Sequence, residues 1–345
     1  CPRRTNAATV ASSSTYRRYQ KVYSPTLVKA FVTGGAGFIG STLTDRLISA
    51  GHDVVVYDNF STGKDEFLRE ALASGRVTVT RGDVLDQSLL TSSMRGCDTV
   101  FHIAANADVR YGLQNPRRDV DQNTLATFHV LEAMRANGID RIVFSSTGSI
   151  YGEPAVFPTP EDAPFPVQTS LYGASKLAGE GLISAYCEGY GFRGFIFRFV
   201  SILGERYSHG HVFDFVRSLR ADPTRLTVLG NGKQRKSYLY VGDCVDAMLR
   251  GLDQATGRVN IFNLGADEYC EVTDSVGWIC DRMGVRPQIE FTGGERGWIG
   301  DSPFIFLDCT RLRSLGWKPT LSIREGVIRT VDFLQAHPWL LEARP

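Results

Sequence analysis

The feature that most constrains this chain is a glycine-rich turn between an apolar run and a helical pattern. Residues 30–32 are apolar, and Gly34, Gly37 and Gly40 follow at intervals of three. Glycines at this spacing let the backbone approach a pyrophosphate, which the free N–H groups of the helix start attract. Asp58 ends the next apolar run, roughly 20 residues beyond the turn. A carboxylate there accepts hydrogen bonds from ribose hydroxyls and repels a 2′-phosphate, so the pattern predicts a dinucleotide site that prefers NAD to NADP.

Short apolar runs continue to alternate with helical patterns after this turn. The predicted strands are 53–57, 77–80, 99–103, 141–145 and 194–199, and the clearest helices are 121–136 and 172–190. This alternation predicts an α/β fold, a Rossmann-type doubly wound parallel sheet. From about residue 201 the sequence becomes irregular and richer in Gly and Pro. We therefore expect an NAD-binding domain at 29–200, rejoined by about 237–264, and a smaller C-terminal lobe at 201–345 that mainly binds substrate.

Composition excludes several classes of partner. Lys plus Arg number 38 and Asp plus Glu 37, so the net charge of +1 provides no basic field for nucleic acid or an anionic membrane. No apolar run approaches the roughly 20 residues that a membrane helix needs. The 7 cysteines lack metal-ligand spacing, which indicates reduced thiols, a cytoplasmic protein and no metal site. Residues 1–28 contain basic but no acidic side chains; we interpret them as a basic extension, with a transit peptide as the alternative.

A second pattern indicates proton-transfer chemistry. Tyr172 and Lys176 are four residues apart, which places both side chains on one face of a helix. A free tyrosine is a poor base at neutral pH, but a neighbouring ammonium favours its phenolate form. Thr147 stands at the predicted carboxyl end of an apolar strand, where such sheets bind their ligands. The three side chains therefore predict a site that oxidises and reduces a secondary alcohol.

These features together resemble the extended short-chain dehydrogenase/reductase family over roughly residues 29–335, and within it the UDP-galactose/UDP-glucose 4-epimerases. The residues that carry the resemblance are Gly34–Gly40, Asp58, Asn59, 82–84, 102–105, Asn123, 145–147, 151–152, Tyr172, Lys176, 230–238 and 240–241. The resemblance implies an NAD site, a nucleotide-sugar substrate, most simply a UDP-sugar, and a homodimer formed by the two long helices. It also implies roles for individual residues.

By this resemblance, cofactor contacts come from the glycine turn with Phe38 and Ile39, and from Asp58, Asn59, Asp83, Val84, Ala104, Ala105, Asn123, Tyr172, Lys176 and Val200. Substrate contacts come from Thr147, Ser149, Ser201, His211, Arg235, Lys236, Tyr238, Arg296 and Asp301. His211 is expected in a loop. Whether Arg235 or Lys236 meets the diphosphate stays open, because the family usually has an Arg where this chain has Lys236.

The reaction implied is inversion at C4 of the sugar through a transient 4-keto form, with NAD regenerated in each cycle. Sugar dehydratases of this family place an Asp-Glu pair directly after the threonine, and the related decarboxylases keep a Glu there. This chain has Gly148 and Ser149, so elimination is disfavoured unless Glu153 or Glu161 reaches the site. The alternatives are an NAD-dependent dehydratase or oxidoreductase that releases its product, and a non-catalytic NAD-sensing protein.

Overall fold

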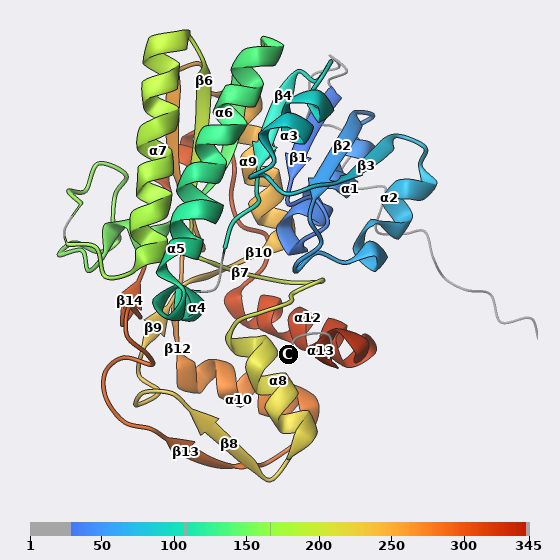
Figure 1. The fold of residues 1–345 in the computed structure, drawn as a ribbon. Coiled ribbons are helices and arrows are strands. Elements are labelled where there is room, and N and C mark those ends of the chain that lie inside the picture. The colour runs from blue at the N-terminus through green and yellow to red at the C-terminus, as the bar shows by residue number, and fades with distance from the viewer. Residues whose placement is uncertain (1–28, 107–108, 166, 343–345) are drawn as a thin grey trace, which may run out of the picture.

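The computed structural model describes residues 29–106, 109–165 and 167–342, so the predicted extension at 1–28 lies outside it. Its centre is a parallel sheet of seven strands in the spatial order β11-β6-β5-β4-β1-β2-β3 (Figure 1). The strands are β1 (Lys29–Thr33), β2 (Asp53–Asp58), β3 (Val77–Arg81), β4 (Thr99–His102), β5 (Arg141–Thr147), β6 (Arg193–Phe199) and β11 (Val259–Leu264). The strand order reverses between β1 and β4, and sheets of this kind bind ligands at the carboxyl ends beside that point.

Helices cover both faces of the sheet because its strands are apolar on both sides. One face carries α1 (Phe38–Ser49) and α9 (Val241–Gln254), and the other α3 (Gln87–Ser93), α6 (Ala126–Asn137) and α7 (Leu171–Tyr190). In β1, Val32 joins the core with Leu43 of α1, whereas Phe31 joins the opposite core with Val130 of α6. The fold class predicted from the alternating pattern is confirmed.

The predicted helix 121–136 differs from the observed structure at its start. A π-helical segment, η3 (Val120–Leu125), precedes α6. The wider turn of a π-helix disrupts the regular spacing on which the sequence pattern depends. It carries Asn123, whose amide donates to Ser175 Oγ of α7 at 2.9 Å. The π-helical segment therefore connects the start of α6 to α7, the helix that bears Tyr172 and Lys176.

A smaller lobe lies beyond the carboxyl ends of the central strands (Figure 1). It contains β7 (Ser201–Leu203), α8 (His211–Ala221), β8 (Arg225–Val228), β9 (Arg235–Lys236), β10 (Tyr238–Tyr240), β12 (Cys270–Glu271), α10 (Val272–Met283), β13 (Gln288–Phe291), β14 (Phe304–Ile305), α11 (Thr310–Ser314), α12 (Ile323–Ala336) and α13 (Trp339–Glu342). The short elements η2 (Asp65–Leu68), α2 (Arg69–Ala73), α4 (Val109–Gln114), α5 (Pro116–Asp119) and η4 (Gly148–Tyr151) connect the strands of the sheet. The placement of His211 in a loop was wrong: it is the first residue of α8, because the apolar side chains of Val212, Phe213 and Val216 form a buried helix face directly after it.

Candidate active site

The glycine turn joins β1 to α1 with almost no space around its backbone. Gly34 has a φ of 69°, and a side chain there would lie 2.7 Å from the Ala104 nitrogen. A Cβ at Gly40 would collide with the Gly34 carbonyl. Gly37 precedes α1 without any side-chain hydrogen bond to the helix start, where Phe38 and Ile39 begin the first turn. The turn thus presents backbone N–H groups in the form that attracts a phosphate.

Asp58 holds this turn against the end of β2. Its carboxylate accepts hydrogen bonds from the Ala36 nitrogen at 2.9 Å and the Phe60 nitrogen at 2.7 Å. Burial raises the pKa of Asp58, and the two backbone hydrogen bonds oppose that shift. Asn59, which directly follows β2, donates to the carboxylate of Asp83, which follows β3, at 2.9 Å. The structure therefore brings together Asp58, Asn59, Asp83 and the buried Val84, which the sequence predicts as the adenosine end of the site.

The loop after β4 contacts both the glycine turn and η3, which in turn contacts α7. Ala104 donates its backbone N–H to Thr33 Oγ1 at 3.2 Å and packs against Gly34, with Ala105 next in the chain. Asn123 accepts a hydrogen bond from the Asn106 nitrogen at 2.8 Å while its amide reaches α7. Asn123 is thus a bridge between two walls of the predicted cofactor site.

Thr147, Tyr172 and Lys176 converge from two elements. Thr147 is the last residue of β5, and Tyr172 is the second residue of α7, which begins after the Ser170 hydroxyl accepts a hydrogen bond from the Gly173 nitrogen. The Thr147 side chain lies beside the Tyr172 hydroxyl, close enough to lower its pKa. Lys176 lies one helical turn further on and is buried. The predicted catalytic groups therefore share one corner of the sheet.

Burial dominates the electrostatics of this corner. It raises the pKa of Tyr172 to about 12, opposed by the hydrogen bond from Thr147. It lowers the pKa of Lys176 to about 7, opposed by the negative charge of Glu180. The Lys176 ammonium nitrogen is 4.4 Å from the Phe144 ring centre, and none of the described residues accepts a hydrogen bond from it. A dinucleotide with ribose hydroxyls fits this corner, since it would give the ammonium the acceptors that it lacks.

The predicted substrate residues fall into three groups. Ser149 donates its backbone N–H to Thr147 Oγ1 at 3.1 Å, and Ser201 begins β7 directly after the buried Val200. In the lobe, the rings of His211 and Tyr238 are 4.8 Å apart, and His211 contacts Ser275 Oγ at 2.8 Å.

The third group contains the charged residues of the lobe. Lys236 Nζ donates to Asp301 Oδ1 at 2.6 Å, and Arg296 donates to the Asp301 carbonyl at 3.2 Å. Arg235 points elsewhere, since its guanidinium stacks 4.1 Å above the Phe304 ring. Adjacent residues of a strand face opposite sides, so of the two only Lys236 shares a cluster with Arg296 and Asp301.

Comparison with known proteins agrees with this arrangement. Residues 30–265 match the model of the NAD dependent epimerase/dehydratase family. The chain belongs to this family. It is 34% identical over 316 residues to the UDP-glucose 4-epimerase of Mycolicibacterium smegmatis, covering 89% of this chain and 99% of that one. A crystal structure of a UDP-galactose 4-epimerase superposes with a TM-score of 0.81 at 36% identity, covering 90% and 100% of the two chains.

A second solved structure contains the predicted type of ligand. The UDP-glucuronic acid 4-epimerase of Bacillus cereus, in complex with UDP-glucuronic acid and NAD, has a TM-score of 0.82 at 26% identity and covers 89% of this chain and 99% of its own. Like other members of the epimerase/dehydratase family, this chain is NAD-dependent. The resemblance stated from the sequence is confirmed.

Three findings bear on other kinds of site in this family member. Across 29–106, 109–165 and 167–342, no three His, Cys, Asp or Glu side chains cluster as metal ligands. None of the helices in those ranges has the length and apolar character needed to cross a bilayer. The six cysteines of the described chain are buried free thiols, and burial raises the pKa of Cys97 to about 11.

Sequence reasoning missed the buried charges behind the epimerase/dehydratase site. Arg198 and Glu180 form an ion pair with side chains 2% and 5% exposed. Arg198 stands inside an otherwise apolar run from Phe195 to Val200, and charged residues are almost never fully buried unless paired. That interruption was the available signal.

Proposed function

We infer that this chain is an NAD-dependent nucleotide-sugar 4-epimerase that inverts C4 of a UDP-hexose. The observation that carries this inference is the placement of Thr147 beside Tyr172, with Lys176 one turn away and no carboxylate directly after the threonine. NAD, held by the glycine turn and Asp58, would supply the hydride acceptor and then the hydride donor for C4 of the sugar. Tyr172 accepts the proton of the 4-hydroxyl and gives it back, and Thr147 orients that hydroxyl. Once the Lys176 amine is protonated, its positive charge favours the phenolate form of Tyr172.

Packing around Gly148 supports inversion over elimination. A Cβ at this position would lie 3.3 Å from Leu307 Cδ1 and 3.4 Å from the Phe199 carbonyl. A dehydratase-like aspartate at position 148 would therefore be tightly packed and would require Leu307 to shift by a few tenths of an ångström. Such an enzyme needs a carboxylate beside the threonine to remove a second proton, and Gly148 and Ser149 provide none.

The two acids that could replace such a carboxylate are engaged elsewhere. Glu161 accepts a hydrogen bond from the Asn263 nitrogen of β11 at 2.9 Å, and its other oxygen is 3.4 Å from Arg311. Glu153 forms an ion pair with Arg296. Neither carboxylate contacts Thr147 or Tyr172, which favours the epimerase over the dehydratase alternative.

The proposed substrate position follows from the charged cluster of the lobe. Lys236 and Arg296 supply positive charge for the diphosphate, and Asp301 accepts hydrogen bonds from ribose hydroxyls. His211 and Tyr238 form the aromatic wall behind them, while Ser149 and Ser201 face the sugar. Glu153 competes with the diphosphate for Arg296, so substrate entry has to break that ion pair.

The protein is proposed to be a cytoplasmic homodimer. The face formed by η3, α6 and the start of α7 exposes Leu125 at 38%, Phe128 at 39% and Leu171 at 38%. Pairing α6 and α7 with the same helices of a second copy would bury these side chains. Sedimentation equilibrium tests this part, and a monomer at micromolar concentration contradicts it.

The experiment that tests the reaction uses UDP-glucose, UDP-N-acetylglucosamine and UDP-glucuronate as substrates. Mass spectrometry and proton NMR follow product mass and the coupling of the C4 proton. We expect one of them to give a product of equal mass with an inverted C4. A product lighter by water or carbon dioxide overturns the epimerase assignment, and steady accumulation of NADH identifies the oxidoreductase alternative instead.

A further inference from the structure

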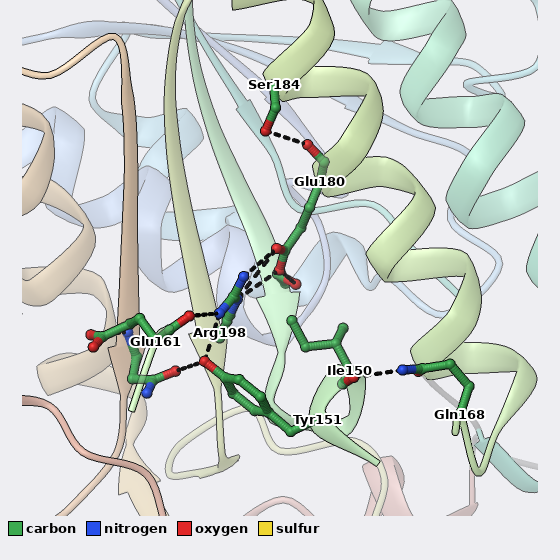
Figure 2. A network of polar contacts seen from close by, with 9 residues as sticks. Ile150, Tyr151, Glu161, Gln168, Glu180, Ser184 and Arg198 are labelled. Carbon is green, nitrogen blue, oxygen red and sulfur yellow. Dashed lines mark hydrogen bonds and ion pairs between the residues drawn. The ribbon is translucent and has the colours of Figure 1, made fainter. Parts of the chain in front are cut away.

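A buried polar network lies behind the proposed catalytic residues, and Arg198 of β6 is its centre (Figure 2). Its guanidinium donates to the Glu180 carboxylate from Nη2 at 2.8 Å and from Nε at 3.1 Å. The third nitrogen, Nη1, donates to the Tyr151 hydroxyl at 2.6 Å and to the Glu161 carbonyl at 2.8 Å. One side chain therefore joins β6 to α7, to η4 and to the loop after η4.

Such a pair is a costly way to fill a protein interior. Moving two charges out of water costs free energy, and the attraction between them does not always offset this cost. Apolar residues of similar volume often stabilise a fold as well or better. What the ions add is geometry, because the planar guanidinium fixes the direction of every hydrogen bond it makes. We therefore expect the network to fix the positions of neighbouring side chains more than it raises the free energy of unfolding.

The positions that it determines are those of the catalytic elements. Glu180 also accepts a hydrogen bond from Ser146 Oγ, and Ser146 directly precedes Thr147 at the end of β5. On α7, Glu180 is four residues after Lys176, so the two side chains share one helix face. The carboxylate therefore links the strand that carries Thr147 to the helix that carries Tyr172 and Lys176.

Glu180 acts on Lys176 through charge as well. Its carboxylate raises the pKa of that ammonium against the effect of burial. The other groups that face Lys176 are the Phe144 ring of β5 and His102 of β4, whose pKa is lowered to about 3 by burial and by the Lys176 charge. His102 is therefore neutral at working pH, and Glu180 is the anion that supports a charged Lys176.

We propose that Glu180 and Arg198 are a positioning pair for the epimerisation inferred above, and that Ser146 transmits their position to Thr147. The pair touches neither substrate nor cofactor in this role. It holds Thr147, Tyr172 and Lys176 in their relative positions. Its loss therefore lowers kcat and leaves KM for the nucleotide sugar almost unchanged.

The decisive variant is the double substitution Glu180→Leu with Arg198→Met, which leaves no unpaired buried charge. A single substitution at either position leaves the other charge buried without its partner, so single variants are expected to lose stability. For the double variant we expect a melting temperature close to wild type, kcat at least tenfold lower and KM within twofold. The acid limb of the kcat profile should move to higher pH, since a less charged Lys176 supports the Tyr172 phenolate less. Ser146→Ala should show a smaller loss of the same kind.

A matched control removes an ion pair on the opposite face, Arg46→Met with Asp246→Leu, whose nitrogen and oxygen are 3.2 Å apart between α1 and α9. It should leave kcat and the pH profile unchanged. A Glu180/Arg198 double variant with wild-type kcat and pH profile overturns the proposal. A readout without turnover separates this from failure of the proposed function. The free energy of unfolding of the cofactor-free protein should begin to rise at a lower pH in the double variant, because Lys176 loses the carboxylate that raises its pKa. If the wild type inverts no sugar and that shift still occurs, only the proposed function is wrong.

Discussion

The ammonium nitrogen of Lys176 lies 4.4 Å from the centre of the Phe144 ring, in a buried position with no acceptor among the described residues. The sequence-based expectation was that this charge acts on Tyr172. In this conformation the influences on the pKa of Tyr172 are burial, Thr147 and Asp119, in that order. Burial outweighs the charge of the nearby Glu180 carboxylate and disfavours the charged amine, so a ligand that supplies acceptors would favour the cationic form.

This relationship predicts an unusual pH dependence of stability. Lys176 has a pKa of about 7 in the folded chain, against an ordinary value of 10.5. Between these values the unfolded chain binds a proton that the folded chain does not, so the free energy of unfolding should rise with pH, by at most about 1.4 kcal/mol per pH unit. Denaturant titration of cofactor-free protein from pH 7 to pH 10 measures it. Lys176→Met should flatten the rise, whereas Lys318→Met, at an exposed position, should preserve it.

Tyr172→Phe should lower kcat by about 10² to 10⁴, the usual effect of removing a positioned acid/base group. Thr147→Val should cost less, because Thr147 orients the proton and does not keep it. Steady-state kinetics with the active nucleotide sugar provide the comparison, and Tyr190→Phe, at a 58% exposed position, is the control. An unchanged rate in Tyr172→Phe would place the active site elsewhere.

NAD should remain bound through purification, because the reaction cycle regenerates it. Denaturation followed by chromatography should release NAD, and a stoichiometric yield of NADP would contradict the prediction. Asp58→Ala should weaken the preference for NAD over NADP. It should also loosen the glycine turn, since the Asp58 carboxylate accepts the Ala36 N–H. Asp53→Ala, at the exposed start of the same strand, should leave cofactor preference unchanged.

Diphosphate recognition should depend on Arg296 and Lys236 and not on Arg235. A hydrogen bond to a charged group contributes about 1.5–3 kcal/mol, so Arg296→Ala should lower kcat/KM tenfold or more. Lys236→Met should have a similar effect. Arg235→Ala is the matched control, because its side chain stacks on Phe304 away from the cluster. A larger loss from Arg235→Ala than from Lys236→Met would reverse the assignment. Equal rates with free sugars would refute the diphosphate site altogether.

Local patterns made the cofactor side of the molecule predictable. The glycine turn, Asp58 and the Tyr172–Lys176 spacing depend on short stretches whose geometry follows from chain stereochemistry. The fold class followed from the alternation of apolar runs and helical patterns in the same way.

The lobe and the buried network were less predictable because their contacts join distant residues. Lys236 meets Asp301 across 65 positions, and Tyr151 meets Asn263 across 112. Contacts between such distant residues leave no periodic pattern in the sequence. The π-helical turn at Asn123 was not predicted from the sequence for a related reason. Its geometry depends on contacts with Ser175 and Asn106 from other elements.

The pairing of β6 with β11 has a consequence for how the chain is made. Strand β6 hydrogen-bonds β5 on one side and β11 on the other, and the whole second-lobe segment from β7 to β10 separates β6 from β11 in the sequence. During synthesis, β6 is an open sheet edge until residue 264 has emerged from the ribosome. An unpaired, apolar edge is a site of aggregation. Ribosome-stalled chains ending near residue 230 should therefore engage chaperones more strongly than chains that include β11.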